Sequence, residues 1–524
     1  MGGGAVATGN QSTAAYAHLL DPNRTWKTNK RIIFLNLWIL LLVITSSTNG
    51  YDGSMMNGLQ SLTQWKTYFN NPTKGKLGLL NAIQNIGSLA AYPISPYLSD
   101  GLGRRAAIFI GATIMLIACV LQTASQSVGM FIGARFLIGF GLTFAAGAAP
   151  LLITEISYPL YRAPLTSTYN SLWYSGAIVA AWATYGSFKI NNTWAWRLPS
   201  ALQALPSVIQ FCLIWFCPES PRWLISKGRN AQALKTLAYY HADGNEQDPL
   251  VQYEYEEIKA AIELDRQVEA TVGWVTLFNT PGNRRRMRII IALAFFSQWS
   301  ANGLVSYYLN KVFDTIGITD PTIQLLINGI LQIWNLAWAL GAAAVVDRVG
   351  RRPLFLISTA GMLVSFAIQT ACSAVYAKKQ NDSAAHAVIA FIFIFYAFYD
   401  VAFSPLIVSY TVEILPFNIR AKGFTVFNFA ISLSLIFNQY VNPIALDAIA
   451  WKYYLVYVAW LVFELVFLYF FIVETKNRTL EETAALFDGE DAVEHITAAA
   501  HHGGPIDEKD EKSSGSFRED LSKV

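Results

Sequence analysis

The sequence predicts an all-α membrane protein with twelve transmembrane helices in two six-helix bundles. Three observations predict this class. The chain has 524 residues and is 53% hydrophobic but only 14% charged, whereas soluble globular proteins carry roughly a quarter charged residues. Hydrophobic residues gather in blocks of about 20, the length that a helix needs to cross a bilayer. Three short sequences also recur between the two halves, which indicates an internal duplication.

The first elements are an N-terminal segment, residues 1–31, and a bundle that covers residues 32–217. The segment lacks the pattern of a cleaved signal peptide, so we expect the first span to direct its own insertion. The second bundle covers residues 288–473. Hydrophobic blocks within the two bundles predict spans at 32–58, 76–98, 106–125, 129–153, 165–187, 196–217, 288–309, 322–346, 353–375, 386–412, 424–446 and 452–473.

Two hydrophilic segments complete the chain. Residues 218–287 form a linker with short helices, because the stretch EYEEIKAAIELDRQ has the charge pattern of a surface helix. Residues 474–524 form an acidic tail with a net charge of −7 that is rich in Gly, Ser and Ala, a composition typical of disorder. Lysines of this tail are candidate acceptors for the ubiquitin-ligase machinery: Lys509, Lys512 and Lys523.

Lysine and arginine residues predict the orientation. They concentrate in the short connections on the side of the two termini and at the flanks of the linker, and basic loops stay cytoplasmic. We therefore expect both termini and the linker in the cytoplasm, with the plasma membrane as the location. Glycosylation sequons begin at Asn191 and Asn381, both on predicted outer loops.

The repeats predict how the halves work. DGLGRR at 100–105 recurs as DRVGRR at 347–352, EISYPLYR at 155–162 as EILPFNIR at 413–420, and NGYD at 49–52 as NGLV at 302–305. Duplicated bundles are the architecture of carriers that rock two halves around a site at the membrane midplane. The net charge of +3 gives no sign of a nucleic-acid partner. The six histidines lie in loops or tails or, for His386, at the first residue of a predicted span, so we expect no metal site and no enzyme activity.

Glycine-interrupted helices at equivalent places in the two halves indicate a transporter binding site. The first span carries NGYDGSMMNG, with Gly50, Gly53 and Gly58, and the seventh carries SQWSANGLVSYY, with Gly303. We expect these glycines to weaken the two helices. The alternative is that they only permit close packing between helices.

Two ionisable residues lie at a similar depth in the first bundle. Asp52 belongs to the first span and Arg135 to the fourth, and an intramembrane ionisable residue is a functional hypothesis by default. We predict that Asp52 takes up a proton from outside and that Arg135 keeps it ionised once the proton has left. The alternative places Asp52 at a wetted helix mouth without a partner.

Other polar side chains in the spans indicate an uncharged, polyhydroxylated substrate. Amides satisfy hydroxyl groups as donors and acceptors, and aromatic faces cover the apolar side of a sugar ring. Asp400, in the tenth span, is expected to bind the proton or a substrate hydroxyl. The alternative is a buried acid that is bonded to a neighbouring helix. The candidate sugar-binding residues are Asn57, Asn170, Gln298, Asn302, Asn335, Tyr410 and Asp400.

The repeats and loop motifs resemble the sugar porter family of the major facilitator superfamily. PESPRWL at 218–224 and VETKNRTLEE at 473–482 extend this resemblance over almost the whole membrane region. SQWSANGLVSYY and YTVEILPFNIRAKG further resemble the fungal lactose and cellobiose permease branch. The resemblance implies a proton symporter that works by alternating access, in which Asp52 and Arg135 are the coupling pair and the proton is the coupling ion in place of a cofactor.

The family also implies a set of cytoplasmic ion pairs that lock the outward-open state. Breaking several such pairs biases a two-state rocker by a few kcal/mol, although the same charges also fix topology. The residues that match are Asp100, Arg104, Arg105, Glu155, Arg162, Glu219, Arg222, Asp347, Arg351, Arg352, Glu413 and Arg420.

The predicted sugar site departs from the hexose pattern of the family. Asn170 stands where the family has Gln, Asn302 is displaced by one position, and Val408 replaces a tryptophan. Smaller groups widen the site, which favours a disaccharide such as lactose or cellobiose. The alternatives are facilitative or proton-coupled transport of a hexose or pentose, and a transporter-like sugar sensor. We expect a monomer.

Overall fold

The computed structural model describes residues 17–19, 29–162, 165, 169, 172–271, 273–476, 483 and 486–488. Every regular element within these residues is a helix, which confirms the predicted all-α class. The N-terminal segment falls largely outside the described residues, and the tail beyond residue 488 falls wholly outside them, together with the candidate ubiquitin sites Lys509, Lys512 and Lys523.

The first bundle consists of six spans, two of which are divided. A short helix, α3 (Thr63–Tyr68), follows the first span outside the membrane segments. The spans are α2 (Lys30–Leu59), α4 (Lys74–Ala91) with α5 (Ser95–Leu102), α6 (Arg104–Thr123), α7 (Val128–Ile156), α9 (Trp173–Ser187), and α10 (Trp194–Leu202) with α11 (Ala204–Leu213).

The second bundle repeats this plan after a linker of four helices. The linker helices are α12 (Pro221–Ser226), α13 (Asn230–His241), α14 (Pro249–Thr271) and α15 (Thr276–Asn279). The spans are α16 (Pro281–Trp299) with α17 (Asn302–Asp314), α18 (Pro321–Val349), α19 (Arg351–Lys379), α20 (Asp382–Ala402) with α21 (Leu406–Ile414), α22 (Phe417–Ile449) and α23 (Tyr453–Phe471).

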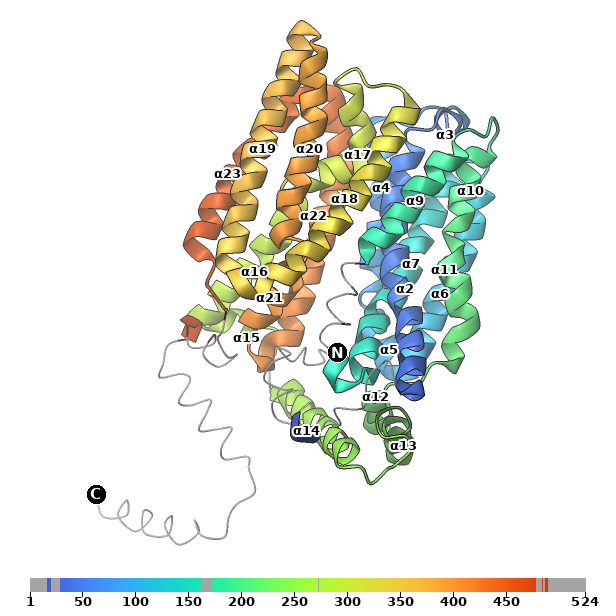
Figure 1. Ribbon diagram of the computed structural model, residues 1–524, viewed down its shortest axis with the longest axis vertical. Coiled ribbons are helices and arrows are strands. Elements are labelled where there is room, and N and C mark those ends of the chain that lie inside the picture. Colours follow the sequence, from blue (N-terminus) through green and yellow to red (C-terminus); the bar gives the residue numbers. More distant parts are fainter. Residues whose placement is uncertain are drawn as a thin grey trace, which may run out of the picture.

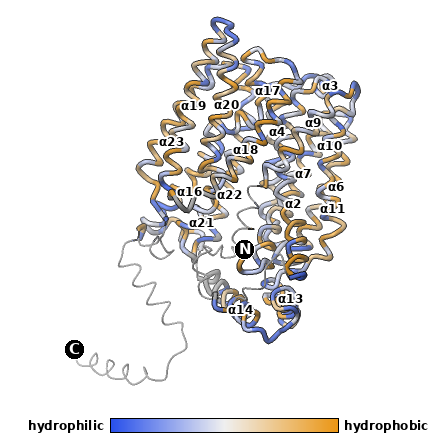
Figure 2. The backbone as a smooth tube through the Cα atoms, viewed as in Figure 1, coloured by the Kyte–Doolittle hydropathy of each residue, from blue (hydrophilic) through white to orange (hydrophobic). Residues whose placement is uncertain are grey.

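Twelve spans can be traced in the described residues, as predicted. Nine helical stretches there are long and apolar enough to cross a membrane, and the stretch Lys422–Phe471 contains two consecutive spans, α22 and α23. The divided pair α4–α5 and the short α9 supply the other two. Hydrophobic residues follow the spans, and hydrophilic residues gather at their ends and on α13 and α14 (Figure 2).

Proline explains breaks that the hydrophobic blocks did not reveal. The tenth span divides next to Pro405 and the second next to Pro93. In the sixth span Gln203 separates α10 from α11, three residues before Pro206. Proline lacks an N–H group and its ring clashes with the preceding turn, so a helix ends or kinks there.

The seventh span is interrupted, as predicted, but not at its glycine, and the first span is not interrupted. The seventh span breaks at Ser300 and Ala301, where Ala301 has a left-handed φ of 72°. Gly303 lies two residues later, inside α17, and packs against the amide of Asn438 without room for a side chain, so close packing accounts for this glycine. By contrast, α2 is continuous. A Cβ on Gly58 would lie 2.9 Å from Thr184, so close packing, the alternative reading, accounts for this glycine.

The two bundles approach each other at one end and diverge at the other. We name the end that carries α12–α15 the linker end, and the opposite end the loop end. Figure 1 shows the bundles converging toward the loop end and separating toward the linker end. The helices in contact across the bundles are α4 with α22, α9 with α18, and α2 with α17.

The linker packs against the first bundle and ends earlier than the sequence indicated. Trp223 of α12 donates from Nε1 to the backbone oxygen of Asp100 at 3.0 Å. The second bundle begins at Pro281, inside the predicted linker. The hydroxyl of Thr280 accepts a hydrogen bond from the backbone N–H of Asn283 at 3.2 Å, and proline favours the first turn of a helix, so the residues themselves define this start.

Candidate functional site

Asp52 and Arg135 form an ion pair inside the first bundle. Arg135 donates from both terminal nitrogens to the two carboxylate oxygens of Asp52, at 3.2 and 3.3 Å. Asp52 is 0% exposed and Arg135 is 2% exposed. A two-pronged contact of this kind suits the planar guanidinium group. The structure therefore brings these residues together, and the alternative of an unpartnered Asp52 at a helix mouth is wrong.

Amide side chains surround this pair, and sequence reasoning did not select them. Gln203, at the break in the sixth span, donates to Asp52 at 2.7 Å, and Gln122 donates to Gln203 at 3.1 Å. Arg135 also donates to Gln84 at 3.2 Å and to the backbone oxygen of Leu80 at 2.8 Å. The available signal was the presence of glutamines within apolar blocks, where an amide needs a partner.

A second buried acid, Asp400 of α20, joins the two bundles. Its carboxylate accepts hydrogen bonds from Tyr174 of α9 at 2.6 Å and from Ser404 at 2.5 Å. The second oxygen, Oδ2, is buried without a hydrogen-bond partner in the described residues. The sequence selected Asp400 but not Tyr174. This contact agrees with a buried acid bonded to a neighbouring helix and leaves one oxygen for a ligand hydroxyl.

Asn57 of α2 lies at another contact between the bundles. Its Nδ2 donates to Oδ1 of Asn328 on α18 at 3.3 Å. Nearby, Gln60 donates to the backbone oxygen of Tyr307 at 2.9 Å, and Asn310 donates to the backbone oxygen of Gln60 at 3.2 Å. These amide contacts connect α2 with the seventh and eighth spans on the side of the loop end.

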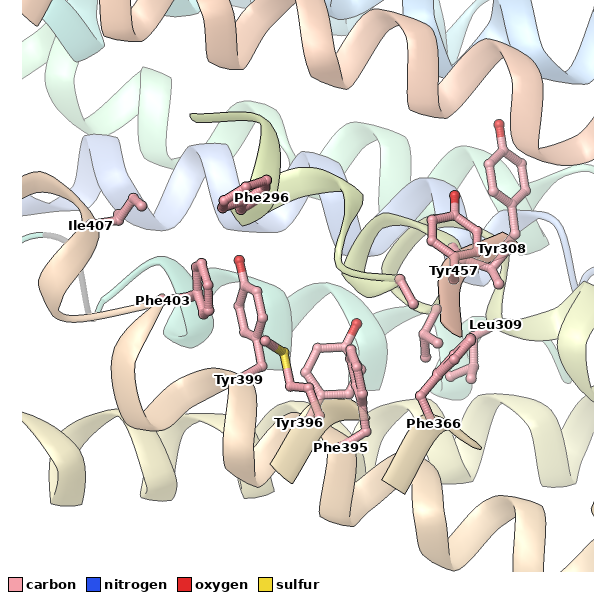
Figure 3. Close-up of a cluster of buried hydrophobic side chains, with 14 of the residues drawn as sticks. Phe296, Tyr308, Leu309, Phe366, Phe395, Tyr396, Tyr399, Phe403, Ile407 and Tyr457 are labelled. Atoms are coloured by element: carbon pink, nitrogen blue, oxygen red, sulfur yellow. The ribbon is translucent and has the colours of Figure 1, made fainter. Parts of the chain in front are cut away.

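The break in the seventh span exposes backbone groups to polar side chains. Tyr396 donates to the backbone oxygen of Asn302 at 3.2 Å, and its hydroxyl lies 2.6 Å from that of Ser306. The backbone oxygen of Gln298 accepts from Asn438 at 2.8 Å. Figure 3 shows Tyr396 and Tyr399 of α20 pointing toward the seventh span from one helix face. Asn302 and Gln298 therefore belong to one polar region at this break.

Three candidate sugar-binding residues do not join these contacts. Tyr410 donates to the backbone oxygen of Val473 at 2.9 Å, just after the last span, and so lies toward the linker end of the second bundle. Asn335 is buried on α18, and its Oδ1 has no hydrogen-bond partner in the described residues. Asn170 lies outside the described residues.

The repeated motifs adopt the same geometry in both bundles. In the first, the backbone N–H groups of Arg104 and Arg105 donate to the carboxylate of Glu219 at 3.2 and 3.3 Å. The side chain of Arg104 pairs with Glu155 at 3.2 Å and with Asp100 at 2.9 Å.

In the second bundle, the backbone N–H groups of Arg351 and Arg352 both donate to Glu474 at 3.0 Å. The side chain of Arg351 pairs with Glu413 at 3.0 Å. Glu474 thus corresponds to Glu219, and sequence reasoning missed it although both acids follow a span in equivalent motifs. The side chain of Asp347 is outside the described part of the chain.

Glycine is required where each of these motifs turns into a helix. Gly103 and Gly350 have φ values of 105° and 107° with ψ values near 160°, a region that is essentially restricted to glycine. A Cβ would also lie 2.5 Å from Glu219 at the first position and 2.9 Å from Glu474 at the second. The shared backbone supports the predicted duplication.

The remaining charged residues of the predicted gate contact the linker or their own bundle. Arg162 pairs with Glu254 of α14 at 3.3 Å, and Glu254 also contacts the ring of His241 at 2.6 Å. Arg420 donates to the backbone oxygen of Leu415 at 3.1 Å, and Arg222 lies on α12. The predicted glycosylation sites Asn191 and Asn381 are exposed and precede α10 and α20.

The profile of a family described as "Sugar (and other) transporter" matches residues 38–487 of the chain. The chain belongs to this sugar transporter family. The transporter is 28% identical over 473 residues to a "High-affinity glucose transporter" of Kluyveromyces lactis, covering 85% of this chain and 84% of that protein. It is 30% identical over 460 residues to the "MFS-type transporter oryC" of Aspergillus oryzae, covering 86% and 85%.

Solved structures show the same fold. The xylose transporter XylE from E. coli in a partially occluded inward-open conformation has a TM-score of 0.71 and 23% identity, over 86% of this chain and all of that one. The inward-open XylE structure has the same TM-score. The two six-helix bundles of the transporter are thus the major facilitator fold. Family and fold identify a multi-pass membrane carrier of sugars and not an enzyme.

Proposed function

We propose that the transporter is a proton-coupled sugar symporter of the plasma membrane. The observation that carries this proposal is the ion pair between Asp52 and Arg135, buried within apolar helices. An ionisable pair at membrane depth is costly, so its presence calls for a function. Coupling of proton movement to sugar movement requires a carboxylate that can gain and lose a proton, and Arg135 is a fixed cation that stabilises Asp52 when the proton has left.

Asp52 connects proton binding to the substrate region because Asp52 and the candidate sugar-binding residue Asn57 lie on the same continuous helix. Asn57 and Gly53 follow Asp52 on the continuous helix α2. Asn57 reaches Asn328 of the second bundle, and a Cβ on Gly53 would lie 3.3 Å from Trp173. Protonation of Asp52 weakens its attraction to Arg135, so α2 can shift relative to α7. Such a shift changes the contacts that α2 makes across the bundles.

The orientation follows from charge. Basic residues of the repeated motifs and the linker all lie at the linker end, which we propose to be cytoplasmic, with both termini on that side. The convergence of the bundles at the loop end then makes this an inward-facing conformation. Closure of the linker end brings the motif charges of the two bundles together and opens the loop end.

The substrate region favours an uncharged sugar. Asn57, Asn302 and Gln298 offer amide groups, Tyr396 offers a hydroxyl, and one carboxylate oxygen of Asp400 has no hydrogen-bond partner among the described residues. This set binds hydroxyl groups as donors and acceptors. We propose a β-linked disaccharide, lactose or cellobiose, because the residues that differ from the hexose pattern are smaller, as in the fungal permease branch that the sequence resembles.

The test is proton uptake by cells that lack their own sugar carriers and express this chain. Lactose, cellobiose and glucose are offered in turn, and alkalinisation of the medium is recorded together with uptake of labelled sugar. We expect alkalinisation with a disaccharide. Asp52→Asn should abolish accumulation and leave exchange of labelled sugar, whereas the exposed Asp382→Asn should change neither. Accumulation at the wild-type level in Asp52→Asn would refute the coupling role.

A second candidate function is transport of glucose, with or without protons. It is favoured by the names of similar proteins, the glucose transporters of Kluyveromyces lactis and of Aspergillus flavus. The same experiment separates the candidates. Alkalinisation with glucose alone keeps the symport and rejects the disaccharide, and glucose uptake without proton movement rejects the symport.

A further inference from the structure

Besides Asp52 and Asp400, a third acid is buried inside the membrane spans, in the last span, and has no role in the mechanism above. Glu464 of α23 is 0% exposed. Both of its carboxyl oxygens lack a hydrogen-bond partner within the described residues. This differs from Asp52, which is paired with Arg135, and from Asp400, which accepts two hydrogen bonds. The structure therefore leaves the charge of Glu464, if it is ionised, uncompensated.

Glu464 occupies the buried face of its helix. The buried residues of α23 are Tyr454, Tyr457, Leu461, Glu464 and Leu468, which follow each other at intervals of three and four, as on the packed stripe of a helix. A glutamate on such a stripe cannot reach water by rotating its side chain. Sequence reasoning could have found it by the rule that selected Asp52, since it is an acid within an apolar span.

The seventh span covers one side of this acid. The ring of Phe296 on α16 lies 6.0 Å from Trp460 and 6.0 Å from Phe463, and 5.4 Å from Phe467. These three residues flank Glu464 on α23. The indole N–H of Trp460, one turn away on the same helix, interacts with the Glu464 carboxyl, although neither group has a hydrogen-bond partner of good geometry in the described residues.

The tenth and ninth spans place hydroxyl-bearing residues at the level of this acid. Tyr399 of α20 interacts electrostatically with both Glu464 and Asp400, and its hydroxyl donates to the backbone oxygen of Ser297 at 2.9 Å. Figure 3 shows this hydroxyl directed toward α16 near Phe296. On α19, Phe366 packs against Tyr457 at 6.2 Å. Because α19 and α23 run antiparallel, Thr359, seven residues before Phe366, lies at the level of Glu464, seven residues after Tyr457. The hydroxyl of Thr359 is also buried without a hydrogen-bond partner in the described chain.

Within the described part of the chain, no cation forms an ion pair with this acid. On α16 the nearest one along the helix face is Arg288, whose guanidinium lies over the ring of Phe471, two turns beyond Glu464. The stretch of α19 from Thr359 to Phe366 carries no charged residue, and α20 contributes the neutral Tyr399. A buried carboxylate without a counter-charge is strongly disfavoured, whereas the protonated acid is tolerated. The surroundings therefore favour a proton on Glu464 in this conformation.

We propose that Glu464 is a second proton-binding site of the transporter, in the second bundle, which holds its proton in the conformation seen here and releases it in another. Release breaks the O–H bond of the carboxyl group, leaves the carboxylate and passes the proton to water. The element that can admit water is the seventh span, because Phe296 and Ser297 lie just before its break at Ser300 and Ala301. Tyr399 interacts electrostatically with both Glu464 and Asp400, and Asp400 accepts a hydrogen bond from Tyr174 of the first bundle.

This proposal rests on the proposed proton coupling, so its test needs one measurement that does not depend on coupling. That measurement is the infrared spectrum of the purified protein, in which a protonated carboxylic acid has its own carbonyl band. We expect such a band in the wild type and in Asp52→Asn, and its loss in Glu464→Gln. Addition of the sugar that the wild type transports, out of lactose, cellobiose and glucose, should change the intensity of the band. Absence of the band, or a band unaffected by sugar, overturns the proposal even if symport is established.

The second measurement is the number of protons taken up per sugar. Glu464→Gln should halve this number and still accumulate sugar, because Asp52 continues to couple. Glu464→Asp keeps a carboxyl group and should restore the wild-type ratio, a rescue that a purely structural role does not predict. Glu464→Met, which matches the apolar surroundings, replaces Glu464→Gln if that variant does not reach the surface. An unchanged ratio in these variants refutes a second site. A wild type that moves no protons refutes the symport, and the infrared measurement then decides on Glu464.

Discussion

Simultaneous removal of Asp52 and Arg135 should destabilise the transporter less than the two single substitutions together predict. The charged atoms are about 3.3 Å apart, which gives an attraction of about 5 kcal/mol at an effective dielectric constant of about 20. Removing one partner leaves a buried charge and costs about 3–5 kcal/mol. Removing both avoids that cost, so we expect a coupling free energy of about 2–4 kcal/mol between Asp52→Asn and Arg135→Gln.

The assay is the free energy of unfolding of purified wild type, both single variants and the double variant in mixed micelles. A matched control is the exposed pair Glu263 and Arg266 of α14, 3.9 Å apart, whose coupling should not exceed about 0.5 kcal/mol. If the effects of Asp52→Asn and Arg135→Gln add to within about 0.5 kcal/mol, the two residues are energetically independent. The pair would then be no coupling element.

Four further predictions follow from particular contacts. Gly103→Ala and Gly350→Ala should each lower the free energy of unfolding by at least about 1–3 kcal/mol, which is measured as a lower melting temperature. Gly101→Ala is the control, because Gly101 has open space around it. Equal melting temperatures for the three variants would contradict the argument that the backbone at Gly103 and Gly350 requires glycine. A short thiol cross-linker between Asn57→Cys and Asn328→Cys should lower sugar uptake relative to the same variant without cross-linker, and unchanged uptake would show that this contact stays closed throughout transport. Tyr174→Phe should raise the KM for sugar and leave the number of protons per sugar unchanged; a changed ratio would place Asp400 in proton coupling instead. Burial lowers the pKa of Lys66 on α3, so the folded protein binds fewer protons than the unfolded chain just below the usual lysine pKa. The free energy of unfolding should therefore rise with pH in that range. If Lys66→Met shows the same rise, another group is responsible for it.

The sequence by itself determined that the protein is an all-α membrane protein, that it has twelve spans, and that its two halves are related by duplication. Blocks of about 20 apolar residues have the length and hydrophobicity of membrane-spanning helices, and repeats such as DGLGRR and DRVGRR predict equivalent structures in the two halves. Asp52 and Arg135 could be selected as partners because charges at the same depth in hydrocarbon have few alternatives to each other.

Tertiary structure decided which polar side chains act together. Gln203, Tyr174 and Glu474 come from elements remote in sequence, and a lone amide or hydroxyl within a span gives no indication of the helix it will face. The breaks next to Pro405 and at Ala301 depend on neighbours as well as on local residues. Gly58 of α2 and Gly303 both lie inside helices in close contact with a neighbour, and the sequence did not show what packs against them. Burial of Glu464 without a partner likewise became visible only when the surrounding helices were in place, since pairing is a property of contacts and not of composition.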